Sequence, residues 1–145
     1  MNIDHNTLIL VADGQKYLFL RNKGDFQQPA LKVEASSEHL GHPTHELGSD
    51  QPGRAFASSG SMRSAIEQTD FHQIEKDQFA ARTAALLSKR AHAGEFEQLI
   101  VVAPPRTLAE LRKHYDKAVS SRLVKEIDKD LTKNPVKEIA DILSR

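Results

Sequence analysis

A short apolar run in the C-terminal half, Leu99–Ala103, constrains the fold more than any other feature of the sequence. The run contains no polar side chain, so a strand made from it needs cover on both faces, as a central strand of a parallel sheet does. Pro104 and Pro105 follow directly and end the strand. Helices must then lie on both sides of the sheet, which predicts an α/β domain.

Three further strands are predicted before that run. Thr7–Ala12 is rich in branched apolar residues and is followed by Asp13 and Gly14, a pair typical of a tight turn. Tyr17–Leu20 comes next and is expected to pair with it as an antiparallel hairpin. Leu31–Ala35 alternates apolar and charged residues, as a strand with one solvated face does. Together they predict a three-stranded meander.

Two helices are predicted from their starting and ending signals. Asp70 and Gln73 have the spacing of a capping box, so a long helix is expected from near Asp70 to a stop at Gly94. Thr107 and Glu110 repeat the capping pattern and predict a second, shorter helix.

The segment 122–132 fits a strand by its alternation and a helix by its i+4 spacing. We favour a strand, because Asn134 and Pro135 then open a final helix. The resulting order, β-β-β-α-β-α-β-α, predicts a mixed five-stranded sheet of spatial order 3-2-1-4-5 with helices on both faces. Such an arrangement resembles the ribonuclease H-like fold. A length of 145 residues admits a single domain.

Composition excludes several classes of protein. The absence of Cys rules out a disulfide framework, a thiol nucleophile and thiolate metal sites. No apolar run approaches the roughly 20 residues that cross a bilayer, and the N-terminus has no signal-peptide pattern, so we expect a cytoplasmic protein without a membrane partner. Lys and Arg total 20, as do Asp and Glu, which disfavours a uniformly basic nucleic-acid binder but permits a local basic face.

The first candidate site lies where the first and fourth strands end. Asp13 and Arg106 follow these two strands, and open α/β sheets bind ligands at this edge. A metal-dependent nuclease or hydrolase of ribonuclease H-like type would use Asp13 and Glu75 as metal ligands. The fourth strand, however, has no carboxylate at its end, so the acidic cluster is incomplete. We favour the explanation that Asp13 and Gly14 form a hairpin turn.

The second candidate is an anion site. Arg106 stands at the start of a helix, where unpaired backbone N–H groups suit a phosphate. The other cations expected to reach this edge are Arg54, Arg63, Lys129 and Lys133. A solvated surface, with Asp128 and Asp130 interspersed, explains them equally well.

Histidines form a third, weak candidate as zinc ligands. They are His39, His42 and His45, at intervals of three, and His72. Solvated side chains are an equally good explanation, because the spacing fits no stringent zinc motif. We therefore predict no metal and no cofactor.

The segment Ser36–Thr69 is rich in Gly, Pro and Ser and shows no apolar periodicity. Structureless connections longer than roughly 12 to 15 residues are uncommon in compact domains and are usually functional or disordered. We therefore predict that this segment is a functional loop.

The same loop carries a family resemblance. Its motif residues are His45, Glu46, Gly48, Asp50, Pro52, Gly53, Arg54, Phe56, Gly60 and Arg63. Asp70, His72, Glu75 and Phe79 follow in the predicted helix, and Val102–Arg112 and Glu126–Thr132 supply later motifs. Over almost its whole length the chain resembles the bacterial host-attachment protein family, the proteins required for attachment to host cells.

That resemblance implies a role in adhesion to a eukaryotic host. The family is also similar to the middle domain of archaeo-eukaryotic peptide-chain release factors, whose Gly-Gly-Gln loop lies between the third strand and the first long helix. The segment Ser36–Thr69 occupies that place here, but no two glycines are adjacent, so peptide release by that motif is not supported. The resemblance implies a non-catalytic domain that binds a ribosome or another structured RNA through its loop. The sequence leaves its oligomeric state open.

Overall fold

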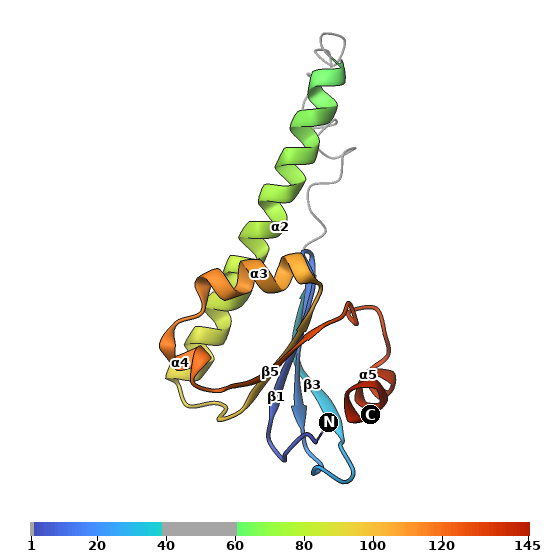
Figure 1. The fold of residues 1–145 in the computed structure, drawn as a ribbon, viewed down its shortest axis with the longest axis vertical. Coiled ribbons are helices and arrows are strands. Elements are labelled where there is room, and N and C mark those ends of the chain that lie inside the picture. The colour runs from blue at the N-terminus through green and yellow to red at the C-terminus, as the bar shows by residue number, and fades with distance from the viewer. Residues whose placement is uncertain (1, 39–60) are drawn as a thin grey trace.

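The computed structural model describes residues 2–38 and 61–145, with side chains described from residue 71 onward in the second range. Five strands form one mixed sheet of order β3-β2-β1-β4-β5, as predicted (Figure 1). The strands are β1 (Leu8–Ala12), β2 (Lys16–Asn22), β3 (Leu31–Glu38), β4 (Leu99–Ala103) and β5 (Leu123–Asp128). The described helices are α2 (Ser61–His92), α3 (Pro105–His114), α4 (Lys117–Ser120) and α5 (Val136–Ser144).

The sheet combines an antiparallel half with a parallel half. β1 pairs antiparallel with β2, and β2 pairs antiparallel with β3, which confirms the predicted meander. β4 lies parallel to β1 on one side and to β5 on the other. The ambiguous segment 122–132 is thus a strand in its first half, as we predicted.

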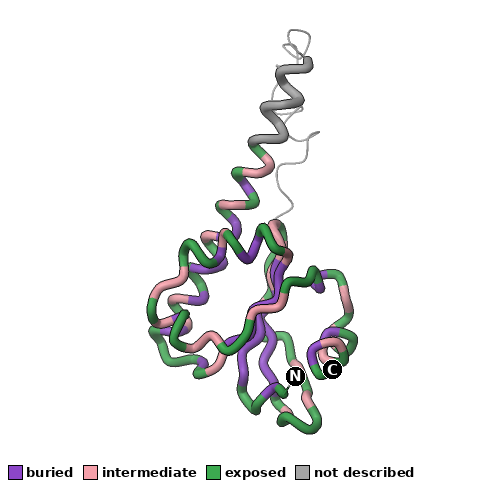
Figure 2. The backbone as a smooth tube through the Cα atoms, in the orientation of Figure 1, coloured by how far each residue is buried: buried purple, intermediate pink, exposed green. Residues whose placement is uncertain are grey.

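Two apolar cores lie on opposite faces of the sheet. Alternate residues of β1 enter each core, with Leu10 on one face and Val11 on the other. Leu87 of α2 packs in the first core, and Ile139 of α5 packs in the second. β1 and β4 are buried along their whole length, as expected for central strands (Figure 2). Helices therefore cover both faces, with α2, α3 and α4 on one side and α5 on the other (Figure 1).

The limits of the predicted loop were wrong at both ends. β3 continues to Glu38, and α2 begins at Ser61, so the connection comprises residues 39–60 and not Ser36–Thr69. Asp70 consequently lies inside α2 and does not cap it. The helix extends well beyond the sheet (Figure 1). The residues before Asp70 already continue the helix, so the capping-box spacing of Asp70 and Gln73 does not mark its start.

The predicted cap of α3 was also wrong. The helix begins at Pro105, with Pro104 as its N-cap, and Thr107 is a buried residue of the first turn. Proline suits this position because the first helical N–H has no partner within the helix. The stop of α2 was predicted correctly, since the helix ends at His92 and Gly94 follows with a φ of 69°.

One short element was not predicted. α4 stands between α3 and β5, and Asp116 caps it by accepting a hydrogen bond from the Val119 N–H. Among the described residues, no helix is both long and apolar enough to cross a membrane.

Candidate functional site

A crevice of about 270 Å³ lies at the carboxyl ends of β1 and β4, where the topology predicts a ligand site. Its walls come from the β1–β2 turn, the start of α3, the segment after β5 and one side of α2. The polar lining residues are Asp13, Gln15, Gln73, Lys76, Asp77, Arg106, Thr107, Glu110 and Asp130. The structure thus places Asp13 and Arg106 in one crevice.

Asp13 is held by several donors. The backbone N–H groups of Gln15 and Lys16 donate to its Oδ1 atom, each at 2.7 Å. Its Oδ2 atom lies 2.8 Å from the Thr132 hydroxyl, which is also 3.0 Å from Oδ1 of Asp130. One hydroxyl proton serves one carboxylate at a time. Asp13 therefore closes the β1–β2 turn and also ties that turn to the segment after β5.

Gly14 allows α2 to approach the same turn closely. A Cβ atom at this position would lie 2.8 Å from Cγ and 3.0 Å from Cβ of Lys76, which is closer than real Cβ atoms pack. The absence of a side chain at Gly14 therefore lets the stem of Lys76 rest on the turn. The close packing places Lys76 at the edge of the crevice.

The charges around the crevice are mixed. Lys76 and Arg106 are its two cations, against four carboxylates, Asp13, Asp77, Glu110 and Asp130. Neither cation makes an ion pair or hydrogen bond with another described residue. Glu110 is engaged by Lys113, whose Nζ atom lies 2.7 Å from Oε1. The described part of the crevice therefore holds two available cations in surroundings that are acidic on balance.

The other predicted site residues lie elsewhere or outside the described residues. Glu75 is buried on α2 and does not line the crevice with Asp13. Lys129 lines a separate hollow of about 330 Å³ beside α5, and Lys133 lines neither. His72 is half-buried on α2. Among the described residues, no group of three or more His, Cys, Asp or Glu side chains is arranged to hold a metal ion.

The predicted loop motif lies outside the described residues, so its placement stays a prediction. This applies to His39, His42, His45, Glu46, Gly48, Asp50, Pro52, Gly53, Arg54, Phe56 and Gly60. Arg63 belongs to α2, and its side chain is not described.

Sequence reasoning missed the contribution of α2 to the crevice. Gln73, Asp77 and Ala80 are spaced at i, i+4 and i+7, which puts them on one helix face, and that face meets the crevice. The sequence shows this spacing. It does not show which face of the helix packs toward the ends of the strands.

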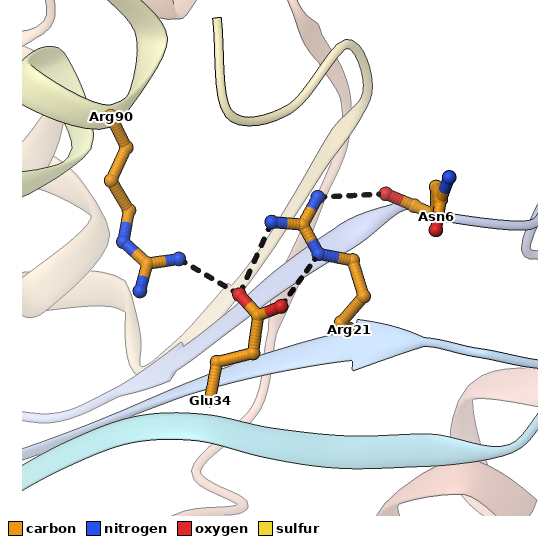
Figure 3. Close-up of polar contacts among 4 residues, drawn as sticks. All are labelled: Asn6, Arg21, Glu34 and Arg90. Atoms are coloured by element: carbon orange, nitrogen blue, oxygen red, sulfur yellow. Dashed lines mark hydrogen bonds and ion pairs between the residues drawn. The ribbon is translucent and has the colours of Figure 1, made fainter. Parts of the chain in front are cut away.

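A second polar cluster lies near the opposite end of the sheet and joins three elements (Figure 3). Arg21 of β2 donates to both carboxylate oxygens of Glu34 on β3, at 3.0 and 3.1 Å. Arg90 of α2 donates to Glu34 at 3.0 Å, and Arg21 also donates to the Asn6 carbonyl at 3.1 Å. The hydrogen bonds from Arg21, followed by the one from Arg90, lower the pKa of Glu34. The cluster therefore fastens α2 to the antiparallel half of the sheet.

Comparison with known protein families then decides the relationship. The family model described as bacterial archaeo-eukaryotic release factor family 12 matches residues 6–143. The chain belongs to this family. The predicted relationship to release factors is confirmed at that level.

Several solved structures are similar to the chain. The crystal structure of an archaeal translation termination factor, aRF1, is similar with a TM-score of 0.43 and 14% sequence identity. The similarity covers 95% of this chain and 35% of that one, so the chain spans about a third of the length of that factor. No curated protein matches the sequence.

Proposed function

We propose that this chain is a non-catalytic, cytoplasmic binding domain that engages a ribosome or another structured RNA. Its membership of a release-factor family is the observation that carries the proposal. Within the described residues, the crevice at the ends of β1 and β4 supplies the best candidate for a phosphate contact.

Two features of the crevice suit a phosphate. Arg106 lies in the first turn of α3, and the N-cap residue Pro104 makes no side-chain hydrogen bond to that turn. The backbone N–H groups of Arg106 and Thr107 therefore have no acceptor within the helix, and they carry the positive end of its dipole. Lys76 adds a second cation from α2. The Arg106 guanidinium and these backbone N–H groups can together bind the oxygen atoms of one phosphate group.

The four carboxylates limit how much anion the crevice accepts. With Asp13, Asp77, Glu110 and Asp130 nearby, a run of several phosphates would be repelled. We therefore propose that the crevice anchors one backbone phosphate, while Arg54 and Arg63 of the predicted loop motif provide further contacts. Base-specific contacts are not needed for such docking.

The environment of Asp13 supports binding over catalysis. Its Oδ1 atom accepts two backbone hydrogen bonds, its Oδ2 atom shares the Thr132 hydroxyl with Asp130, and Glu75 does not share its crevice. A two-metal mechanism needs several convergent carboxylates with free oxygens. Asp13 instead holds a turn and the segment at Thr132.

Sedimentation with purified ribosomes tests the proposal. The protein is expected to co-sediment at about 50 mM salt and much less at about 200 mM, because phosphate contacts release counterions. Arg106→Ala and Lys76→Ala should each weaken binding. Each should also reduce the slope of log K against log salt concentration by about 1, the value for one lost phosphate contact. Lys117→Ala, at an exposed cation of α4 outside the crevice, is the matched control. An Arg54→Ala/Arg63→Ala pair tests the loop. Failure to co-sediment at any salt concentration would refute the proposal.

Two other functions have distinct outcomes. Cleavage of RNA or DNA with magnesium or manganese, abolished by Asp13→Asn, would establish a nuclease in place of a binding domain. Recovery of the protein from the cell surface on fractionation would support direct adhesion to a host. Our proposal predicts an inert protein in the first assay and a cytosolic one in the second.

A further inference from the structure

A groove of about 420 Å³ lies between α2 and the edge strand β3, apart from the crevice. Tyr17 and Ser37 contribute from the sheet side. Phe79, Arg82, Leu86 and Lys89 are the main contributors from α2. None of these residues lines the crevice, so the groove is a separate surface.

The floor of the groove is apolar and well supported. The Tyr17 ring lies 5.9 Å from the Phe79 ring and 5.1 Å from the ring of Phe19 in the core. Phe79 is 4% exposed, whereas Leu86 at the rim is 37% exposed. An exposed Leu beside an aromatic floor offers a seat for one large apolar side chain.

The rim of the groove is positively charged. Arg82 and Lys89 are exposed and seven residues apart, so they lie two turns from one another on the same helix face. Among the described residues, no carboxylate lines the groove, and neither cation has an ion pair. The Arg82 guanidinium stands 5.8 Å from the centroid of the Phe79 ring. An acidic partner would therefore complement the rim.

The neighbouring strand offers backbone groups. β3 is the edge of the sheet, and no other described strand pairs with its outer side. Alternate N–H and C=O groups of an edge strand point outward and can pair with an added strand. The Arg90–Glu34 ion pair of 3.0 Å holds α2 beside β3, so the groove is formed before any partner arrives.

We propose that this groove binds an extended acidic segment of a partner protein, which adds to β3 as a sixth strand. A large apolar side chain of the segment rests on Tyr17 and Phe79, and its carboxylates pair with Arg82 and Lys89. Strand addition of this kind takes affinity from backbone hydrogen bonds and specificity from side-chain pockets. The inference goes beyond the proposed function, because it concerns a different surface and a protein partner.

Two other occupants fit less well. Bases stack on exposed ring faces, but the ring of Phe79 is buried and Tyr17 is half-buried, so an RNA strand would find only one partly exposed ring in the described lining of the groove. A second copy of the chain related by two-fold symmetry would bring groove against groove, and Arg82 and Lys89 would then face cations.

A direct test uses the full chain and a fluorescein-labelled decapeptide that alternates Glu and Leu. Fluorescence anisotropy should show saturable binding, with at least roughly tenfold weaker binding of a Lys/Leu and of a Glu/Ser peptide. Leu86→Ala and the pair Arg82→Glu/Lys89→Glu should each weaken binding of the Glu/Leu peptide by about tenfold or more. Because these three side chains are exposed, the variants should remain folded. Val124→Ala, at an exposed residue of the opposite edge strand β5, is the control and should bind normally.

The position of the peptide is read from backbone amide NMR shifts of the ¹⁵N-labelled chain. The largest changes are expected at residues 32–38 of β3 and at 79–89 of α2. Equal binding of the Lys/Leu peptide, or changes centred on β5, would overturn the proposal. Binding of an oligo(U) strand in place of the peptide would make the groove an RNA site, and a dimer in sedimentation velocity would make it a self-interface.

Residues 39–60 provide a last discriminating experiment. If the Glu/Leu peptide binds only after this segment is replaced by a short Gly/Ser linker, the chain's own segment occupies the groove and the proposed partner is excluded. None of these outcomes depends on co-sedimentation with ribosomes, so the two proposals fail independently.

Discussion

The ion pairs of Glu34 give the sharpest test of what holds α2 to the sheet. Glu34→Gln keeps the shape of the side chain and removes its charge. The Arg21, Glu34 and Arg90 side chains are 10%, 26% and 19% exposed, so the cluster is partly shielded from water. In the variant, the new amide NH₂ group faces guanidinium donors and at least one charge-assisted hydrogen bond is lost (Figure 3).

The magnitude follows from this partial burial. A hydrogen bond to a charged group contributes about 1.5 to 3 kcal/mol, and breaking a fully buried pair costs about 3 to 5 kcal/mol. An exposed pair contributes only about 0 to 1 kcal/mol. For side chains between a tenth and a quarter exposed, we expect Glu34→Gln to lower the free energy of unfolding by about 2 kcal/mol at pH 7. The contact of Arg90 with the Phe19 ring, 4.6 Å from its centroid, remains in the variant.

The pH dependence supplies a second, independent readout. The pKa of Glu34 in the folded protein lies below its ordinary value of 4.5, so its charged form is favoured by folding. The contribution is therefore fully present above the unfolded pKa and is lost as pH falls through the lower folded pKa. The difference between wild type and Glu34→Gln should shrink below about pH 4.5.

Urea unfolding followed by circular dichroism at pH 7 and at pH 3 measures both effects. Glu97→Gln is the matched control, because Glu97 is exposed and makes no ion pair among the described residues. A loss below about 0.5 kcal/mol at pH 7, within the range of ordinary surface substitutions, would refute the reasoning. So would a loss that does not change with pH.

Three further substitutions probe other parts of the structure. Asp116→Asn should lower the urea midpoint at pH 5 but hardly at pH 2, because a hydrogen bond from Ser88, above all, lowers the pKa of Asp116 to about 2 and its contribution disappears as pH falls toward that value. Leu87→Ala, at a fully buried site in the first core, should cost about 2 to 5 kcal/mol and lower Tm in calorimetry, and an unchanged Tm would contradict the assigned core. Gly14→Ala should displace Lys76, lower stability by about 1 kcal/mol and weaken ribosome co-sedimentation as Lys76→Ala does; normal co-sedimentation would exclude Lys76 from the contact.

Local pattern was enough to predict the sheet. The uniform burial of Leu99–Ala103 is a property of neighbouring residues, because a central strand is covered on both faces. The alternation of Leu31–Ala35 predicted a strand correctly, but an irregularity opposite Phe19 and Leu20 breaks its face pattern. Leu31 therefore packs against one core and Ala35 against the other. The crossover rules then left one favoured order for the five strands, and the structure has that order. The ends of the helices and of the loop, which we predicted from polar residues, were less predictable. α2 begins at Ser61, well before the capping-box spacing of Asp70 and Gln73 that predicted its start.

The candidate site was predictable only in part. Asp13 and Arg106 were placed correctly because each directly follows a predicted strand, and the ends of those strands share one edge. Lys76, Asp77, Glu110 and Asp130 were missed, since their contribution depends on how two helices and a loop pack. We expected a basic rim. The described part of the crevice instead has two cations and four carboxylates.

The sequence by itself determined the class of the fold, favoured five strands and indicated the sheet edge where Asp13 and Arg106 share a crevice. These features follow from hydrophobic burial, because the apolar pattern of each segment indicates which of its residues are buried. Only the tertiary structure decided which polar groups meet. Thr132 lies 119 positions from Asp13 yet contacts its carboxylate, and Arg90 reaches Glu34 across 56 positions. Such contacts need a donor and an acceptor about 3 Å apart, and the spacing of residues along the chain does not indicate which distant groups come that close.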